Sequence, residues 1–263
     1  MLNIVNKLDE LSRNEYPNPI KRLHYLNQNI PKMMDCQNTN LSNNVDMRLF
    51  RGYASELIMT NILEVVKLYC NVQVKEGLLI PISNGTTQLD HFILTPTHGI
   101  VIEVKHVYGN IDIDGTNMVV SNDNEVRKMT PWNQNLYHIC KLKEFLGLNN
   151  LFFYNAVFIY GDYDIKGFNP VKGNILLQYD TAVRDIINLI NSKPEYKPNK
   201  KDILLAVKKI NNLKNYSILN HISNVRKWNK TWEENYIIKI LMNFWGYMEI
   251  NGGKNSYLCL ENF

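Results

Sequence analysis

The sequence contains few of the residues that mark the specialised classes of protein. Its 263 residues include only 4 cysteines, 13 glycines and 9 prolines, which excludes collagen-like, disordered and disulfide-rich chains. The cysteines lie far apart and form no C-x-x-C pair, so we expect free thiols and neither a zinc knuckle nor a redox motif. With 45% hydrophobic and 21% charged residues, the chain is predicted to fold as one large domain, alone or with an appendage.

Long hydrophobic runs are also missing. The most apolar segment, Leu151 to Tyr160, is about ten residues long, roughly half of the length that a transmembrane helix needs. The first residues, MLNIVNKLDE, carry charged side chains where a secretory signal has an unbroken apolar stretch. We therefore expect a soluble cytoplasmic protein with no membrane partner.

Positive charge is unevenly distributed along the chain. The net charge is +4, yet the segment from Lys193 to Lys230 contains ten basic and two acidic residues. Such a segment favours a polyanionic partner, nucleic acid above all. The alternative is that the lysines only keep the outer faces of a Lys-rich and Asn-rich chain solvated.

Changes in composition divide the chain into three regions. Residues 1–48 form a polar N-terminal extension, whose helical stretches should be broken by Pro17, Pro19 and Pro31. Residues 49–191 form the main domain. Residues 192–263 form a basic and mainly helical C-terminal region, with predicted helices in the segments DILLAVKKI, SILNHISNV and TWEENYIIKILMNFW.

Basic and aromatic residues alternate near the middle of this C-terminal region. Trp228 and Trp232 lie among Arg226, Lys227 and Lys230, as in a groove that follows a nucleic-acid strand. The two tryptophans are four residues apart, so the alternative is that they anchor the last helix to the core. We favour this second interpretation.

The main domain has an α-β-β-β-α-β order of elements. Apolar residues recur at helical spacing from Met47 to Cys70. Three strands rich in branched residues follow, VQVKEGLLIPI, TQLDHFILTP and IVIEVKHV. The connections SNGT and THG are too short to hold a helix, so these strands are predicted to form an antiparallel meander.

Further elements complete the main domain. A small hairpin, NIDIDGTNMVV, precedes a helix that should start at Thr130-Pro131 and end at Gly147. The segment LFFYNAVFIY is apolar on both faces, which predicts a strand in the interior of the sheet. A strand GNILLQY and a helix over residues 181–191 follow.

Two carboxylates and a lysine lie on the second and third strands. Glu103 and Lys105 share a strand face, because side chains alternate along a strand, and antiparallel pairing of the two strands brings Asp90 close to Glu103. Two carboxylates repel each other, and a divalent cation removes that cost. Mg²⁺ fits best, since it prefers oxygen ligands, and Lys105 would assist a metal-bound water. The alternative is an ordinary salt-bridged sheet edge.

These residues resemble the NERD (nuclease-related) domain, a branch of the PD-(D/E)xK restriction-endonuclease-like superfamily. The resemblance covers about residues 50 to 160 and rests on RGYASE, TQLDHFILTPTHGIVIEVK and PWNQNLYH, in this order. It implies an α/β fold of the restriction-endonuclease type, with a mixed central sheet flanked by helices, to which the residue pattern outside the resemblance adds a helical C-terminal appendage. It also implies a Mg²⁺-dependent nuclease, with Mn²⁺ as a substitute.

The resemblance assigns site residues one by one. The metal carboxylates fall on Asp90 and Glu103, the lysine on Lys105, the acidic helix position on Glu56, as a further metal ligand, and the helical glutamine on Gln134. Gln134 lies one turn before His138 at the start of its helix, where backbone N–H groups favour a phosphate. For His138 a core or surface role stays open, and for Glu56 a solvated helix position. Neither His91 nor His106 is expected to bind zinc.

The sequence leads to three hypotheses. The first is a metal-dependent nuclease that hydrolyses phosphodiester bonds, most readily in DNA. The second is a nucleic-acid-binding module on the same fold that does not cleave. The third is a protein-interaction module whose C-terminal helices dock a partner.

Overall fold

The computed structural model describes residues 2–38, 44–82, 85–123, 125–148, 151–194 and 198–213. Its helices are α1 (Leu2–Glu15), α2 (Pro19–Asn38), α3 (Asn44–Lys67), α4 (Pro131–Leu146), α5 (Ala182–Asn191) and α6 (Lys200–Asn212). Its strands are β1 (Gln73–Ile82), β2 (Gly85–Leu94), β3 (Gly99–Gly115), β4 (Asn117–Ser121), β5 (Val126–Met129), β6 (Phe153–Pro170) and β7 (Asn174–Gln178). The two predicted helices after α6, together with Trp228 and Trp232, lie outside the described residues.

Seven described strands form one mixed sheet. β1 pairs antiparallel with β2, and β2 pairs antiparallel with the start of β3, as the meander predicted. β6 pairs parallel with β3 along its whole length and is followed on its other side by β7, also parallel. β6 is therefore the interior strand that its apolar segment predicted.

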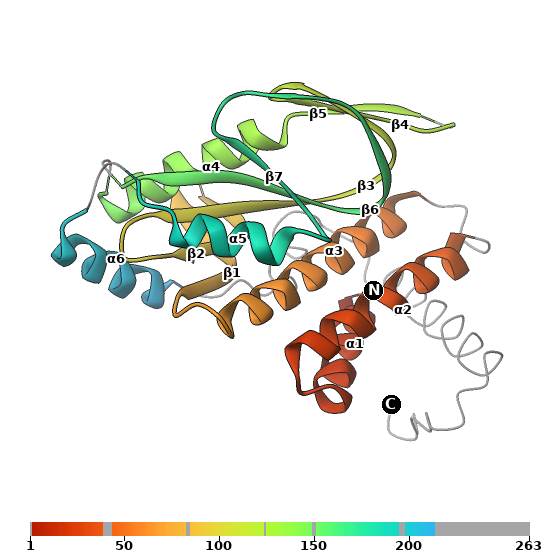
Figure 1. The fold of residues 1–263 in the computed structure, drawn as a ribbon, viewed down its shortest axis with the longest axis horizontal. Coiled ribbons are helices and arrows are strands. Elements are labelled where there is room, and N and C mark those ends of the chain that lie inside the picture. The colour runs from red at the N-terminus through yellow and green to blue at the C-terminus, as the bar shows by residue number, and fades with distance from the viewer. Residues whose placement is uncertain are drawn as a thin grey trace.

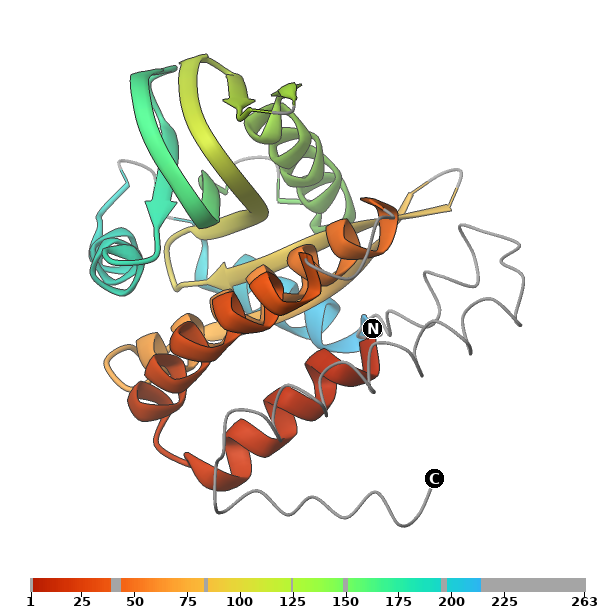
Figure 2. The ribbon, with the colours of Figure 1, turned by 90° about the vertical axis from the view of Figure 1, so that its right-hand side faces the viewer.

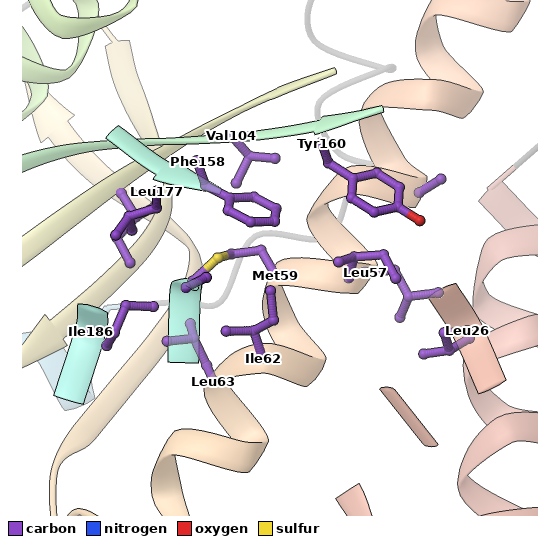
Figure 3. Close-up of a cluster of buried hydrophobic side chains, with 14 of the residues drawn as sticks. Leu26, Leu57, Met59, Ile62, Leu63, Val104, Phe158, Tyr160, Leu177 and Ile186 are labelled. Carbon is purple, nitrogen blue, oxygen red and sulfur yellow. The ribbon is translucent and has the colours of Figure 1, made fainter. Parts of the chain in front are cut away.

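Helices cover both faces of the sheet. α3 and α5 pack on one face, where Met59 and Ile62 of α3 meet Phe158 of β6 (Figure 3). α4 and α6 pack on the opposite face, against residues of β1 to β3 such as Phe92 and Val101. This arrangement confirms the predicted fold class, an α/β protein consistent with a restriction-endonuclease-like core. None of the described helices is both long and apolar enough to span a membrane.

β3 and β6 are longer than the apolar segments that predicted them. Both continue as a curved parallel ribbon (Figure 1), and β5, which was not predicted, pairs with β4 beside it. The second half of β6 alternates exposed and half-buried residues, so apolar content alone does not reveal it. Pairing with β3 determines its conformation instead.

Two glycines lie where this ribbon bends. Gly161 has φ +134°, and a Cβ there would lie 2.0 Å from the carbonyl oxygen of Val107. Gly109 has φ +109°, with the carbonyl oxygen of Ser121 at 2.3 Å from the same hypothetical atom. Only glycine satisfies both the positive φ and the close approach of the neighbouring backbone.

The predicted break in the N-terminal helices occurs between α1 and α2, where Pro17 lies and which Pro19 follows, but the predicted break at Pro31 is wrong. Pro19 is the first residue of α2 and Pro31 lies within it. At the first position the missing N–H has no helical partner in any case. Pro31 is exposed, and the helix continues through it because Leu26 and Ile30 are fully buried in the core that α3 forms.

The N-terminal helices lie on the outer side of α3 (Figures 1 and 2). The buried guanidinium of Arg22 in α2 donates to the side-chain oxygen of Asn61 in α3 at 2.6 Å. Asn61 in turn donates to the carbonyl oxygen of Leu57. The buried polar groups between α2 and α3 are therefore hydrogen-bonded, and α2 packs against the main domain through these bonds as well as through apolar contacts.

The helix that carries Gln134 has the predicted ends. Thr130 occupies the N-cap position with Pro131 following, although its side chain makes no capping hydrogen bond. Gly147 ends the helix in the left-handed conformation, with φ +70°, and its N–H donates to the carbonyl oxygens of Lys143 and Glu144. This is the C-cap that the sequence predicted.

Candidate active site

The candidate site lies where β2 and β3 separate. The last paired residues of the two strands are His91 and Ile102, so Asp90 and Glu103 are the next residue on each strand. Beyond this point the carboxylate of Asp90 replaces the missing backbone partner, since its Oδ2 accepts from the N–H of Val104 at 2.9 Å. The two carboxylates that the sequence selected therefore meet at the fork between the strands.

Lys105 connects this fork to α4. Its Nζ donates to Oε1 of Glu103 at 2.5 Å and to the side-chain oxygen of Gln134 at 3.1 Å. Glu103 is only 2% exposed, whereas the Lys105 side chain is 24% exposed. The ammonium group thus lies between a buried carboxylate and solvent, and the exposed Gln134 holds it from the side of the helix.

His138 faces the second oxygen of Glu103. Nδ1 of His138 lies 3.6 Å from Glu103 Oε2, too far for a hydrogen bond. Both atoms are buried and have no hydrogen-bond partner. A pair of buried polar atoms without hydrogen-bond partners in a native structure needs an explanation, and a role in a functional site is one of them. His138 therefore belongs to the site by position.

Glu56 approaches the same cluster from α3. Its half-buried carboxyl group lies near enough to Asp90 and Glu103 for their negative charges to act on it, and Lys105 acts on it in the opposite sense. The structure thus brings together all five residues that the sequence proposed as a site, from β2, β3, α3 and α4.

Desolvation governs the electrostatics of the cluster. Burial raises the pKa of Glu103 to about 7, and the charge of Asp90 adds to the effect. Burial, then the charges of Asp90 and Glu103, raise the pKa of Glu56 to about 8. Burial also raises the pKa of Asp90, although the hydrogen bond from Val104 opposes it. The protein thus holds carboxyl groups in a place that disfavours their charge, which is typical of functional sites.

Sequence reasoning missed the residues that fix α4 in place. Asn135 is fully buried, and its side-chain nitrogen lies within 3.0 Å of the carbonyl oxygens of Val101 and Ala156. The indole N–H of Trp132, also fully buried, donates to the carbonyl oxygen of Ile175. These bonds tie the first turns of α4 to the sheet and so place Gln134 and His138. A polar residue on the apolar side of the helix was the available signal for Asn135.

The other two histidines of this region lie on the opposite face of the sheet. His91 is within 3.1 Å of the hydroxyl of Thr60 in α3, and burial lowers its pKa to about 3. His106 is within 3.3 Å of the hydroxyl of Ser55. Neither points into the carboxylate cluster.

The donor set of the cluster suits a hard cation. Asp90 and Glu103 offer oxygen ligands, and Glu103 Oε2 is a buried oxygen without a partner. No group of three or more His, Cys, Asp and Glu side chains that could hold a metal ion occurs among the described residues. Mg²⁺ needs no such group, since it is commonly held by one or two carboxylates with waters and substrate phosphates as the other ligands.

One comparison with known proteins gave a match, to part of the chain. Residues 51–160 match the family model NERD, the nuclease-related domain. The match confirms the resemblance that the sequence motifs indicated, and it spans all five site residues. Comparisons with curated proteins and with solved structures gave no match.

Proposed function

We propose, on the premise that residues 51–160 form a nuclease-related domain, that this protein is a metal-dependent nuclease. Its reaction would be hydrolysis of phosphodiester bonds in nucleic acid, most readily in DNA. The observation that supports the proposal best is the position of Lys105, bonded to Glu103 and Gln134 beside the carboxylate of Asp90. A binding-only surface has no reason to hold two carboxylates where a polyanion must approach.

Asp90 and Glu103 would hold Mg²⁺, with Mn²⁺ as a substitute and Glu56 as a further ligand, directly or through water. When bound, the cation would supply Lewis-acid stabilisation of negative charge and acidify a bound water. Its charge would also offset the desolvation that raises the pKa of all three carboxyl groups.

The protein's own groups would do the remaining work. The ammonium of Lys105 can donate to the attacking water or to a phosphate oxygen, because it is partly exposed while its stem is anchored at the fork. Gln134 holds that ammonium in place through its side-chain oxygen. Preorganised donors of this kind typically contribute a factor of about 10² to 10³ in rate.

Digestion of supercoiled, linear and single-stranded DNA, and of RNA, with and without Mg²⁺ tests the proposal. Cleavage by the wild type should require the metal and should be lost in Asp90→Asn and Lys105→Ala. Glu144→Gln and Lys141→Ala are matched controls, since these residues form an exposed ion pair on α4 and their loss should leave the rate unchanged.

Two results would contradict the proposal. The first is a wild-type protein that cleaves none of these substrates, and the second is cleavage that persists in Asp90→Asn and Lys105→Ala. Salt-dependent binding without turnover would instead indicate the non-cleaving module. A stable protein complex that withstands nuclease treatment would indicate the interaction module.

A further inference from the structure

A second concave site lies on the opposite face of the sheet from the carboxylate cluster. It is a pocket of about 580 Å³ lined by residues of α2, α3, the middle of β3 and β6, and the end of β7 with the two residues that follow it. This volume is within the range of pockets that bind small organic molecules. The proposed hydrolysis uses none of its lining residues.

Aromatic rings dominate the walls of this pocket. Its lining includes four tyrosines, Tyr108, Tyr160, Tyr163 and Tyr179. Tyr160 and Tyr179 meet edge to face with centroids 5.9 Å apart. Tyr160 is held further by its hydroxyl, which donates to the side-chain oxygen of Asn27 at 3.0 Å. Tyr108 is 55% exposed, so its ring is available to stack on a ligand.

Hydrogen-bond acceptors accompany these rings in the lining. Asp162 and Asp180 are exposed carboxylates in the lining. Asp180 lies close enough to Tyr163 for its charge to contribute, after burial, to raising the pKa of that tyrosine to about 12. Carboxylates and amides next to flat aromatic surfaces are the groups that recognise the exocyclic amine of a nucleobase.

The lining also includes a positive charge. Arg51 lines the pocket beside His106, and its charge, after burial, lowers the pKa of His106 to about 4. His106 is therefore a neutral hydrogen-bonding group at neutral pH, while Arg51 supplies a cation suited to a phosphate. A ligand with an amine-bearing ring and an anionic group matches both the carboxylates and the guanidinium of this lining, whereas a purely apolar or purely cationic ligand does not.

The pocket and the carboxylate cluster are back to back. His106 follows Lys105 on β3, and Ser55, within hydrogen-bond distance of His106, precedes Glu56 on α3. Residues 103–109 of β3 pair with β6 on one edge but with neither β2 nor β4 on the other. The two sites are thus neighbours on either side of β3, so a nucleic-acid strand bound at the cluster would have the pocket close by.

We propose that this pocket binds an unpaired nucleotide whose base carries an exocyclic amine, with its base among the tyrosines and its phosphate toward Arg51. The inference rests on the proposed function and deepens it. The substrate class would be nucleic acid that has unpaired bases beside the bond to be cleaved. Adenine, guanine and cytosine qualify, and thymine does not. The same chemistry could come from a free nucleotide or from a nucleotide within a strand.

Fluorescence anisotropy with the full-length protein in EDTA tests the pocket without cleavage. The probes are short single-stranded oligo(dA) and oligo(dT), a blunt duplex, and AMP as a competitor. Oligo(dA) should bind more tightly than oligo(dT) or the duplex. Tyr108→Ala should raise its Kd by about tenfold, the usual cost of losing one stacked base. Asp180→Asn should reduce the preference for oligo(dA) over oligo(dT).

Tyr69→Ala is the matched control, because Tyr69 is also highly exposed but lies outside this pocket. An unchanged Kd in Tyr108→Ala, or equal binding of oligo(dA) and oligo(dT), would overturn the inference. Competition by AMP as strong as that by oligo(dA) would support the pocket and identify the free nucleotide as the source. Loss of cleavage in every assay, with these binding results intact, would remove only the nuclease proposal.

Discussion

At the residue scale, the hydrogen bond from Lys105 to Gln134 allows a positioning role of Gln134 to be tested separately from a role in stability. Gln134 is exposed and its side chain bonds to Lys105. Gln134→Ala should therefore lower the single-turnover cleavage rate by roughly tenfold and leave the midpoint of thermal unfolding unchanged. Asn133→Ala, on the same exposed turn of α4 and bonded to Thr116, is the control. A rate loss of equal size in both variants would contradict the positioning role.

The raised pKa values of the carboxyl groups predict an unusual dependence of stability on pH. Glu103 has a folded pKa of about 7 against an ordinary value of 4.5, so the folded state binds its proton more tightly than the unfolded state does. The stabilising contribution is complete below about pH 4.5 and is lost as pH rises through 7. In EDTA, the free energy of unfolding contributed by this group should fall over that range.

Urea denaturation at several pH values measures the effect. In Glu103→Gln, the fall in the free energy of unfolding between pH 4.5 and 8 should be smaller than in the wild type by on the order of 1 to 3 kcal/mol. Glu144→Gln, an exposed carboxyl on α4, should run parallel to the wild type. Mg²⁺ should stabilise the wild type more at pH 8 than at pH 5, because it binds the ionised carboxylates. An equal dependence of the free energy of unfolding on pH in Glu103→Gln and wild type would show that burial does not raise the pKa of Glu103.

At the element scale, the bend in the β3–β6 ribbon depends on glycine. Gly161→Ala would force a side chain into a positive φ and against the carbonyl oxygen of Val107, so we expect a loss of about 3 kcal/mol or more in stability. Gly52→Ala is the matched control, since Gly52 lies within α3 with nothing within 4 Å of the added Cβ. It should stabilise by about 0.5 to 1 kcal/mol. Equal effects would contradict this account of the bend.

The elements that the sequence predicted well are those with a local signal. The meander follows from two short connections, and α4 follows from Thr130-Pro131 and Gly147, all read from neighbouring residues. Asp90 and Glu103 were brought together by strand alternation and pairing alone. This local information brought two of the five residues together, and the family resemblance added Glu56 and Gln134 and the roles of all five.

Elements without a local signal were missed or shortened. The second half of β6 is polar and owes its conformation to pairing with β3, a partner about fifty residues away in the chain. The predicted break at Pro31 follows from helix propensity, which takes no account of the burial of Leu26 and Ile30 in the same helix. Asn135 reaches backbone groups of two strands, which no spacing rule reveals.

At the scale of the whole molecule, α1 and α2 pack against the same core as the main domain. Leu26 of α2 is fully buried in the cluster that contains Met59 of α3 and Phe158 of β6. Leu26→Ala should cost about 2 to 5 kcal/mol and lower the midpoint of one cooperative unfolding transition. Leu204→Ala, at a residue 60% exposed on α6, is the control. A separate early transition in Leu26→Ala would show instead that the N-terminal helices unfold on their own.

The unpaired stretch of β3 has a consequence for solubility. Exposed strand edges invite other chains to add to the sheet and so promote aggregation, and charged side chains are a common protection. Here the Asp90 carboxylate already accepts from the N–H of Val104, and Lys105 is the next residue, so groups proposed for chemistry would also hinder the addition of another strand. Neutral substitutions at these positions should therefore increase light scattering on storage, and inactive variants prepared for crystallisation would be better made with one charge retained.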